Sequence, residues 1–283
     1  MAAWRVPRWT AIGLLLAAIL YARGFIRLHR QMPLRFPRSR LAFYLAGLAA
    51  LALALVSPLE GLDDCLLVTH MVQHLLLLMI APPLLLLGAP QIPLVRALPP
   101  RLAKRTIGVM AKSRACRGFF DLITHPAAAL PIFSLVMLGW HLPGPFQAAL
   151  RSDNWHITEH GCMIAAGILF WYPVILPWPA ADRWPRWALA PYLLIADAEN
   201  SLLAGFMVLS GRLLYPYYAS VPRIGGITPM NDQVLAGAIM WVPGSFLFLI
   251  PAIALLMMEL RPHSLVRPGW NTHMRSRGSA AVI

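Results

Sequence analysis

The sequence predicts an all-α membrane protein, a bundle of about seven transmembrane helices forming one domain over residues 1–283. Hydrophobic residues make up 59% of the chain, and only 12% of the residues are charged. A soluble domain usually carries roughly a quarter charged residues. The apolar residues are gathered in runs close to the length of about 20 residues that a helix needs to cross a bilayer. These two observations favour a polytopic bundle.

Seven segments are long and apolar enough to be spans. The first follows Arg5 and Arg8, which also makes it a candidate signal peptide. Its apolar run extends to Ile26 without a convincing small-residue cleavage site, so we interpret it as a retained span. The predicted spans are 8–26, 41–57, 66–88, 126–142, 156–177, 188–210 and 234–258.

Basic residues predict how the bundle is oriented. Nineteen of the 24 Lys and Arg residues fall in the segments 23–40, 88–125, 178–187 and 261–283. Cytoplasmic loops are enriched in Lys and Arg, so the N-terminus is expected outside and the basic tail 261–283 in the cytoplasm. Topology and anionic membrane lipid account for the net charge of +13, and no nucleic-acid partner is expected.

Five of the nine histidines fall at the predicted outer end of the bundle. His70 and His74 are four residues apart at the start of the third span, and His156 and His160 have the same spacing at the start of the fifth. His141 ends the fourth span. Residues four apart share one face of a helix. Ionisable groups within spans are costly and are functional candidates by default.

Two histidine pairs at one depth favour a transition-metal site. We therefore predict His70, His74, His141, His156 and His160 as metal ligands. The H-x-x-E-H spacing of residues 156–160 also matches inverzincin peptidases, although no soluble catalytic chamber accompanies it. Glu159 is interpreted as a supporting residue that orients a histidine or carries charge for the cation. The structural alternative is that these histidines bind helix neighbours or water.

Other polar residues allow two interpretations each. Glu60, Asp63 and Asp64 make the outer loop acidic, which would attract a cation but is also expected of a loop without Lys or Arg. Asp197 and Glu199 in the sixth span could form a proton or ion path, or could pair with other spans for assembly. Met207, Met230 and Met240 are interpreted as packing residues, with a soft-metal path as the alternative.

Three blocks follow one another between residues 55 and 250. They are His70-Met71-Val72-Gln73-His74 with Ala81-Pro82-Pro83 and Gly88-Ala89-Pro90, then Trp155-His156 and Glu159-His160 with Phe170 to Val174, then Tyr215-Pro216 through Asp232-Gln233 to Met240-Trp241. In these blocks the chain resembles the CtaG family of seven-span cytochrome c oxidase assembly factors. The resemblance implies a non-enzymatic factor of the bacterial inner membrane that supplies copper to cytochrome c oxidase subunits.

Alternatives remain beside that expectation. A permease for copper or another cation would use Asp197 or Glu199. A haem-binding electron carrier would take one axial histidine from each of the third and fifth spans. A scaffold would use the histidines only for hydrogen bonding.

Overall fold

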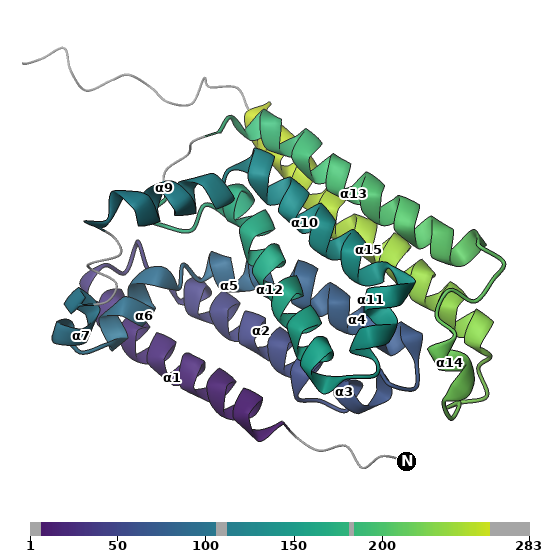
Figure 1. The fold of residues 1–283 in the computed structure, drawn as a ribbon. Helices are drawn as coiled ribbons and strands as arrows, with labels where there is room; N and C mark the ends of the chain where they lie inside the picture. The colour runs from purple at the N-terminus through teal and green to yellow at the C-terminus, as the bar shows by residue number, and fades with distance from the viewer. Residues whose placement is uncertain (1–6, 106–111, 181–183, 261–283) are drawn as a thin grey trace, which may run out of the picture.

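The computed structural model describes residues 7–105, 112–180 and 184–260, and within them the chain is helical without strands (Figure 1). The predicted all-α class is confirmed for this part. The predicted basic tail 261–283 lies outside the described residues. The long helices are α1 (Arg8–Gln31), α2 (Arg38–Leu55), α10 (Pro126–His141), α12 (Asp153–Ile175), α13 (Arg186–Leu209) and α15 (Pro229–Glu259).

The third predicted span is built from three consecutive helical segments. They are α4 (Leu67–Leu75), the π-helical turn η1 (Leu76–Ile80) and α5 (Ala81–Leu87). Pro82 and Pro83 have no N–H to donate, so a regular α-helix cannot continue through them. The π-helical turn directly before them changes the register, so the side chains that precede it and follow it face different directions. Such turns are frequent at functional sites.

Several helices are longer than the predicted spans, and the segments between spans contain further helices. The region 88–125 contains α6 (Gln91–Ala97), α7 (Pro100–Arg105) and α9 (Arg114–Ile123). At the other end of the molecule lie α3 (Leu59–Leu62), α11 (Pro143–Ala149) and α14 (Tyr217–Ser220). Hydropathy marks the part of a helix that suits lipid, whereas Arg and other good helix formers let the helix extend beyond it.

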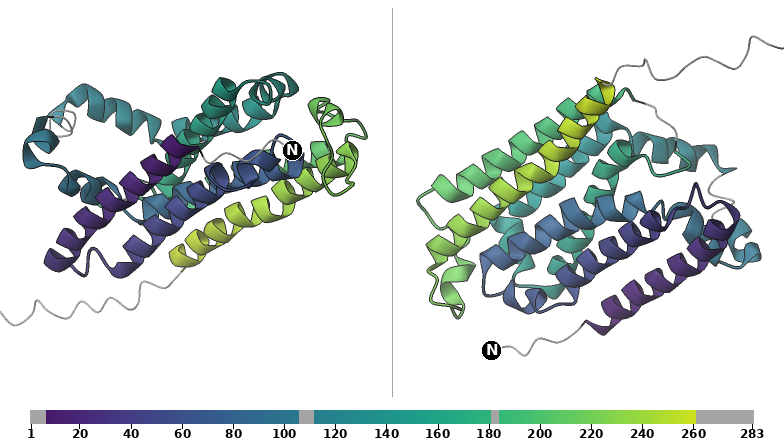
Figure 2. Two further views of the ribbon diagram at one scale, coloured as in Figure 1. Left: turned by 90° about the horizontal axis from the view of Figure 1, so that it is seen from below. Right: turned by 180° about the vertical axis from the view of Figure 1, so that it is seen from behind.

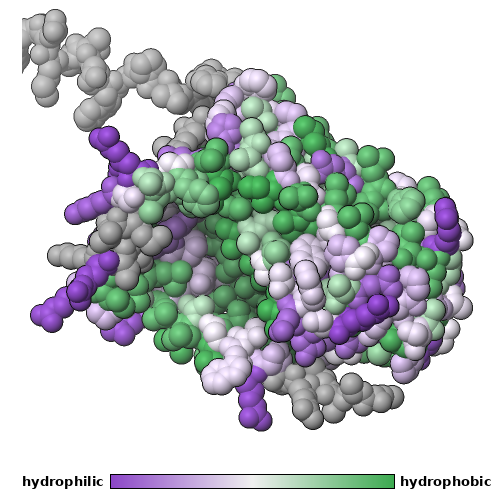
Figure 3. Space-filling model, in the orientation of Figure 1, coloured by the Kyte–Doolittle hydropathy of each residue, from purple (hydrophilic) through white to green (hydrophobic). Residues whose placement is uncertain are grey.

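Five helices of the described chain are long and apolar enough to cross a membrane, and α9 with α10, bent by 63°, would make a sixth. Helix α12 is long enough, but two histidines and Glu159 in its first half make it more polar. The count of seven spans and the orientation of the termini therefore stay predictions. Hydrophobic residues cover the middle of the face in Figure 3, as expected of a surface in contact with lipid.

The helices form two layers. Seen from behind, α15, α4 with α5, α2 and α1 follow one another across the molecule, and α10 and α12 cover the opposite face (Figure 2). Helix α13 packs along α15. Gly167 lets α12 approach the π-helical turn, because a Cβ at this position would lie 2.7 Å from the carbonyl oxygen of Leu78. This close approach brings side chains of the polar first half of α12 into contact with side chains of α4.

Asp232 anchors the start of α4. Its carboxylate accepts hydrogen bonds from the backbone N–H groups of Leu67 and Val68, at 2.9 and 3.0 Å. These are first-turn amides that the helix itself cannot satisfy. Arg223 contacts the same carboxylate at 2.9 Å and also donates to the carbonyl of Cys65. A fully buried acid from α15 thus sets the position at which α4 begins.

We expect Gly167→Ala to destabilise the protein by about 1–3 kcal/mol, because the added methyl group forces α12 away from a backbone carbonyl. Gly161→Ala on the same helix is the matched control, since a Cβ there meets nothing within 4 Å. Thermal unfolding in detergent measures both. Equal melting temperatures for the two variants would contradict the close packing.

We expect Asp232→Ala to cost about 2–4 kcal/mol, because two backbone N–H groups and the Arg223 guanidinium lose their acceptor. Asn231→Ala serves as the control, since Asn231 is exposed on the same helix turn. Thermal unfolding again provides the measurement. If Asp232→Ala melts like Asn231→Ala, the carboxylate does not anchor α4.

Candidate metal centre

The two histidines of α4 lie on one buried face of that helix. His70 is 0% and His74 is 3% exposed, and their Nε2 atoms are 2.9 Å apart. Phe146 of α11 packs on the His70 ring, with centroids 4.7 Å apart, and covers it from the end of the bundle. Both imidazoles are therefore held away from solvent and beside each other.

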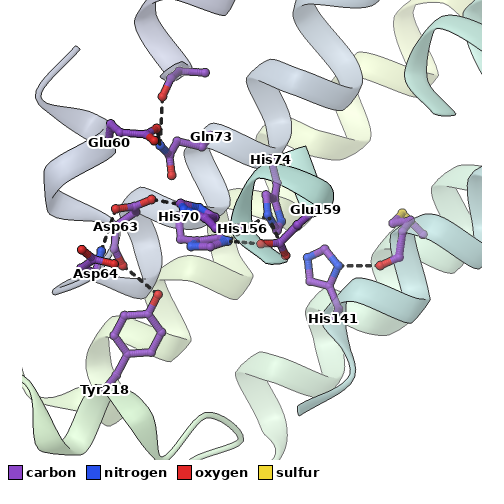
Figure 4. Close-up of polar contacts among 12 residues, drawn as sticks. Glu60, Asp63, Asp64, His70, Gln73, His74, His141, His156, Glu159 and Tyr218 are labelled. Atoms are coloured by element: carbon purple, nitrogen blue, oxygen red, sulfur yellow. Dashed lines mark hydrogen bonds and ion pairs between the residues drawn. The ribbon is translucent and has the colours of Figure 1, made fainter. Parts of the chain in front are cut away.

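Glu159 of α12 faces these histidines across the helix interface (Figure 4). One carboxylate oxygen lies 3.4 Å from His70 Nε2 and the other lies 3.3 Å from His74 Nε2. The glutamate is 0% exposed, and within the described part of the chain its ion-pair partners are these two imidazoles. A buried carboxylate needs a compensating cation or strong hydrogen bonds, because desolvation of the charge is costly. The cluster is thus organised around one negative group.

The second pair completes the cluster. The rings of His156 and His160 are 4.2 Å apart, and the His156 ring stacks on His70 at 5.4 Å. Four residues, His70, His156, Glu159 and His160, each offer one ligand atom, and these atoms all lie within 4.8 Å of one another. The two helices therefore bring three imidazoles and one carboxylate to one point.

His141 lies at the side of this group, next to His74, with ring centroids 5.2 Å apart. Its Nδ1 lies 2.6 Å from the carbonyl oxygen of Met137 and donates to it, which leaves Nε2 as the nitrogen with a free lone pair. Tyr215 donates a hydrogen bond to the carbonyl of His141 and holds the end of α10 in place.

Several ring nitrogens of the cluster have no hydrogen-bond partner although they are buried. They are His70 Nδ1, His74 Nδ1, His141 Nε2, His156 Nε2 and His160 Nε2. Buried polar atoms in proteins are nearly always paired. Neutral imidazole nitrogens are also the commonest metal ligands in proteins. The donor set therefore fits a transition-metal ion better than it fits a purely structural group of histidines.

The acidic loop contributes Asp63, which the sequence reasoning did not select as a site residue. Its carboxyl is fully buried and one oxygen lies 3.3 Å from His156 Nε2. Burial, together with the carboxylates of Asp64 and Glu60, raises the pKa of Asp63 to about 8. The Asp63 carboxyl therefore borders the cluster next to the His156 ring. The sequence feature that could have identified Asp63 is an acidic residue close to the histidine-bearing span, with no basic residue nearby.

Gln73 connects the same loop to α4. Its amide donates to the carbonyl of Ala54 and to Glu60, at 2.9 and 3.1 Å. Tyr218 of α14 donates to the carbonyl of Asp63 at 2.9 Å. The acidic loop is therefore part of the wall of the cluster rather than a free surface loop.

The structure brings together all five predicted histidines and Glu159. Within this set, the ligand atoms of His70, His156, Glu159 and His160 form a compact group. His74 and His141 lie beside that group. Glu159 was predicted as a supporting residue, and its carboxylate instead lies among the candidate ligand atoms. The other described histidines are elsewhere, with His29 beside the carbonyl of Phe36 and His125 capping α10.

The acids of the sixth predicted span do not join the cluster. Asp197 and Glu199 each have one buried oxygen without a hydrogen-bond partner. Glu199 lines an open groove between α10 and α13, together with Ser134. Asn200, the residue after Glu199, faces inward and donates to the carbonyl of Met240.

Comparison with known proteins gives relatives as well as a family. Uncharacterized proteins of Mycobacterium bovis and Mycobacterium tuberculosis are each 26% identical over 247 residues, which are 84% of this chain and 36% of theirs. An uncharacterized protein of Mycobacterium leprae is 24% identical over 268 residues, 91% of this chain and 40% of its own. The chain thus spans less than half the length of these relatives. No solved structure matches it.

A family model described as cytochrome c oxidase caa3 assembly factor matches residues 19–261, which include every residue of the cluster. The resemblance noted in the sequence is therefore confirmed over most of the chain. The protein belongs to the Caa3_CtaG family of cytochrome c oxidase assembly factors.

Proposed function

We propose that this protein is a non-enzymatic membrane factor that binds copper at His70, His156, Glu159 and His160 and passes it to a cytochrome c oxidase subunit during assembly. The observation that carries the proposal is the meeting of these three imidazoles and one carboxylate within 4.8 Å inside the bundle. His74, His141 and Asp63 border the group, and the first two serve as additional ligands during uptake or release.

Charge and chemistry both favour a metal cargo. A divalent ion would compensate the buried carboxylate of Glu159 and engage imidazole nitrogens that have no other partner. Sites of nitrogen and oxygen donors bind Cu²⁺ more tightly than the other divalent first-row ions. Copper is also the metal that the family resemblance implies, because haem–copper oxidases require it.

We further propose that α10 and α12 cross the membrane too, which would give seven spans, and that the histidine cluster lies at the outer face of a bacterial inner membrane. The short helices α3, α11 and α14 close that end of the molecule, and α6, α7 and α9 with their basic residues lie at the opposite end. This arrangement supports the orientation that the distribution of Lys and Arg predicts.

The geometry gives less support to the alternatives. A peptidase must admit a peptide to its glutamate, whereas Glu159 is fully buried among imidazoles. A permease that uses Asp197 or Glu199 would need them on the metal path, yet Glu199 lines a groove on the outside of the bundle. A haem carrier is distinguished by the Soret absorption that haem would give to the purified protein.

We expect the detergent-purified protein to bind about one equivalent of Cu²⁺ at the cluster. Glu159→Gln keeps the shape of the side chain but removes its charge. It should raise the copper Kd by at least about 10–100-fold, the cost of losing even an indirect partner of a metal site. Competition titration with a copper chelator measures this.

His125→Asn is the control for that titration, because Asn still provides a helix N-cap acceptor and His125 lies outside the cluster. Equal copper affinity for Glu159→Gln and wild type would contradict the proposed site. Copper binding weakened equally by His125→Asn would show an unspecific effect.

In cells, we expect a strain lacking this protein to accumulate oxidase that is poor in copper. Wild type and His125→Asn should restore the copper content and activity of the oxidase in isolated membranes. The quadruple variant His70→Ala/His74→Ala/His156→Ala/His160→Ala should not, and added copper should partly rescue it. Normal oxidase maturation with this variant, present at wild-type level in the membrane, would refute delivery through the cluster.

A further inference from the structure

A small cavity lies behind the histidine cluster, between α4, η1, α10, α13 and α15. Its volume is about 20 Å³, which is enough for one water molecule or one metal ion. It lies where the two clusters of buried hydrophobic residues meet, since Met79 and Met137 belong to one and Met71 and Met240 to the other. Its lining consists of Met71, His74, Leu75, Leu78, Met79, Met137, His141, Asn200, Met240 and Phe248.

Methionine dominates this lining. Met71, Met79, Met137 and Met240 come from four different helical segments, and none of them is more than 3% exposed. A single buried methionine usually fills a gap in a core. Four thioethers around a cavity of this size can also act as metal ligands, and soft sulfur ligands select Cu⁺ over harder cations.

Two histidines add nitrogen donors to the same cavity. His141 donates its Nδ1 hydrogen to the carbonyl of Met137, so its Nε2 has a free lone pair (Figure 4). His74 directs Nε2 toward Glu159, and its Nδ1 has no partner. Both residues are at least 96% buried and both line the cavity. Each therefore offers an unpaired buried nitrogen to a cavity that is otherwise lined by thioethers, apolar groups and the Asn200 side chain.

Helix geometry explains why these residues converge. Met71 and His74 are three apart on α4, and Met137 and His141 are four apart on α10, so each pair shares a helix face. Met71 is one position beyond His70 and therefore faces the cavity rather than the metal centre. The π-helical turn contains Met79. Asn200 donates to the carbonyl of Met240 and holds that part of α15 against α13.

We propose that this cavity is a second metal site, selective for Cu⁺, with thioether ligands from Met71, Met137 and Met240 and a nitrogen ligand from His141. His74 lies between the two sites, because its Nε2 faces Glu159 and its ring lines the cavity. The inference deepens the proposed function and rests on it for copper as the cargo. It assigns the nitrogen and oxygen centre to the divalent ion and the cavity to the monovalent one.

Silver ion is the probe, because Ag⁺ shares the preference of Cu⁺ for thioether sulfur and does not change oxidation state during a titration. The variant is Met71→Leu/Met137→Leu/Met240→Leu, in which the volume of each side chain is nearly conserved. The control is Met207→Leu, because Met207 is also fully buried but does not line the cavity. Full-length protein in detergent is used throughout, and its melting temperature verifies folding.

We expect the triple variant to bind Ag⁺ at least about tenfold more weakly than wild type and Met207→Leu, with Cu²⁺ affinity unchanged. X-ray absorption of wild type loaded with one equivalent of Ag⁺ should show silver–sulfur scattering, which the triple variant lacks. Should the triple variant fail to fold, the single variants Met137→Leu and Met240→Leu are measured in the same way.

The result that overturns the inference is unchanged Ag⁺ affinity in the methionine variants, or silver bound without sulfur in the wild type. The two proposals fail separately. Loss of Cu²⁺ binding in Glu159→Gln with no effect of the methionine variants would leave the proposed function and remove the second site. Loss of Ag⁺ binding in the methionine variants, with normal Cu²⁺ binding in Glu159→Gln, would do the reverse.

Discussion

The histidine cluster depends on one buried carboxylate. Glu159 is removed from solvent, and the contacts that define its surroundings are imidazoles of α4. A negative charge in such an environment is unfavourable unless protons or a cation compensate it. Bundles can place such a group inside a membrane when it serves a function. The proposed cation site accounts for this arrangement, because a bound ion would supply the compensating charge. The helices that carry the site are held in place independently of any ion.

That support comes from contacts outside the cluster. The close approach at Gly167 brings α12 against the π-helical turn, and Asp232 sets the start of α4. Phe146 covers His70 from the end of the bundle. Because these contacts need no metal, ligands can be held near one another while an ion enters and leaves. A carrier that must give up its cargo requires this property more than it requires the tightest binding.

The sequence predicted much of this arrangement and missed part of it for physical reasons. The spacing of four residues predicted that each histidine pair shares one helix face. The distribution of Lys and Arg between the loops predicted that both pairs lie at the same depth, at the outer end of the bundle. Spacing within a helix says nothing about which faces of different helices meet, so the position of the Glu159 carboxylate among the histidine nitrogens was not predicted. Asp63 was missed because a loop sequence does not reveal burial. The capping of α4 by Asp232 joins residues 165 positions apart.

The measurement that tests the central claim most directly is the anomalous X-ray scattering of copper in crystals of the protein soaked with one equivalent of Cu²⁺. Data collected on either side of the copper absorption edge locate the ion without assumptions about its ligands. The account predicts one strong peak within bonding distance of at least three of His70, His156, Glu159 and His160. A peak bound elsewhere, with these four side chains unchanged, would contradict it.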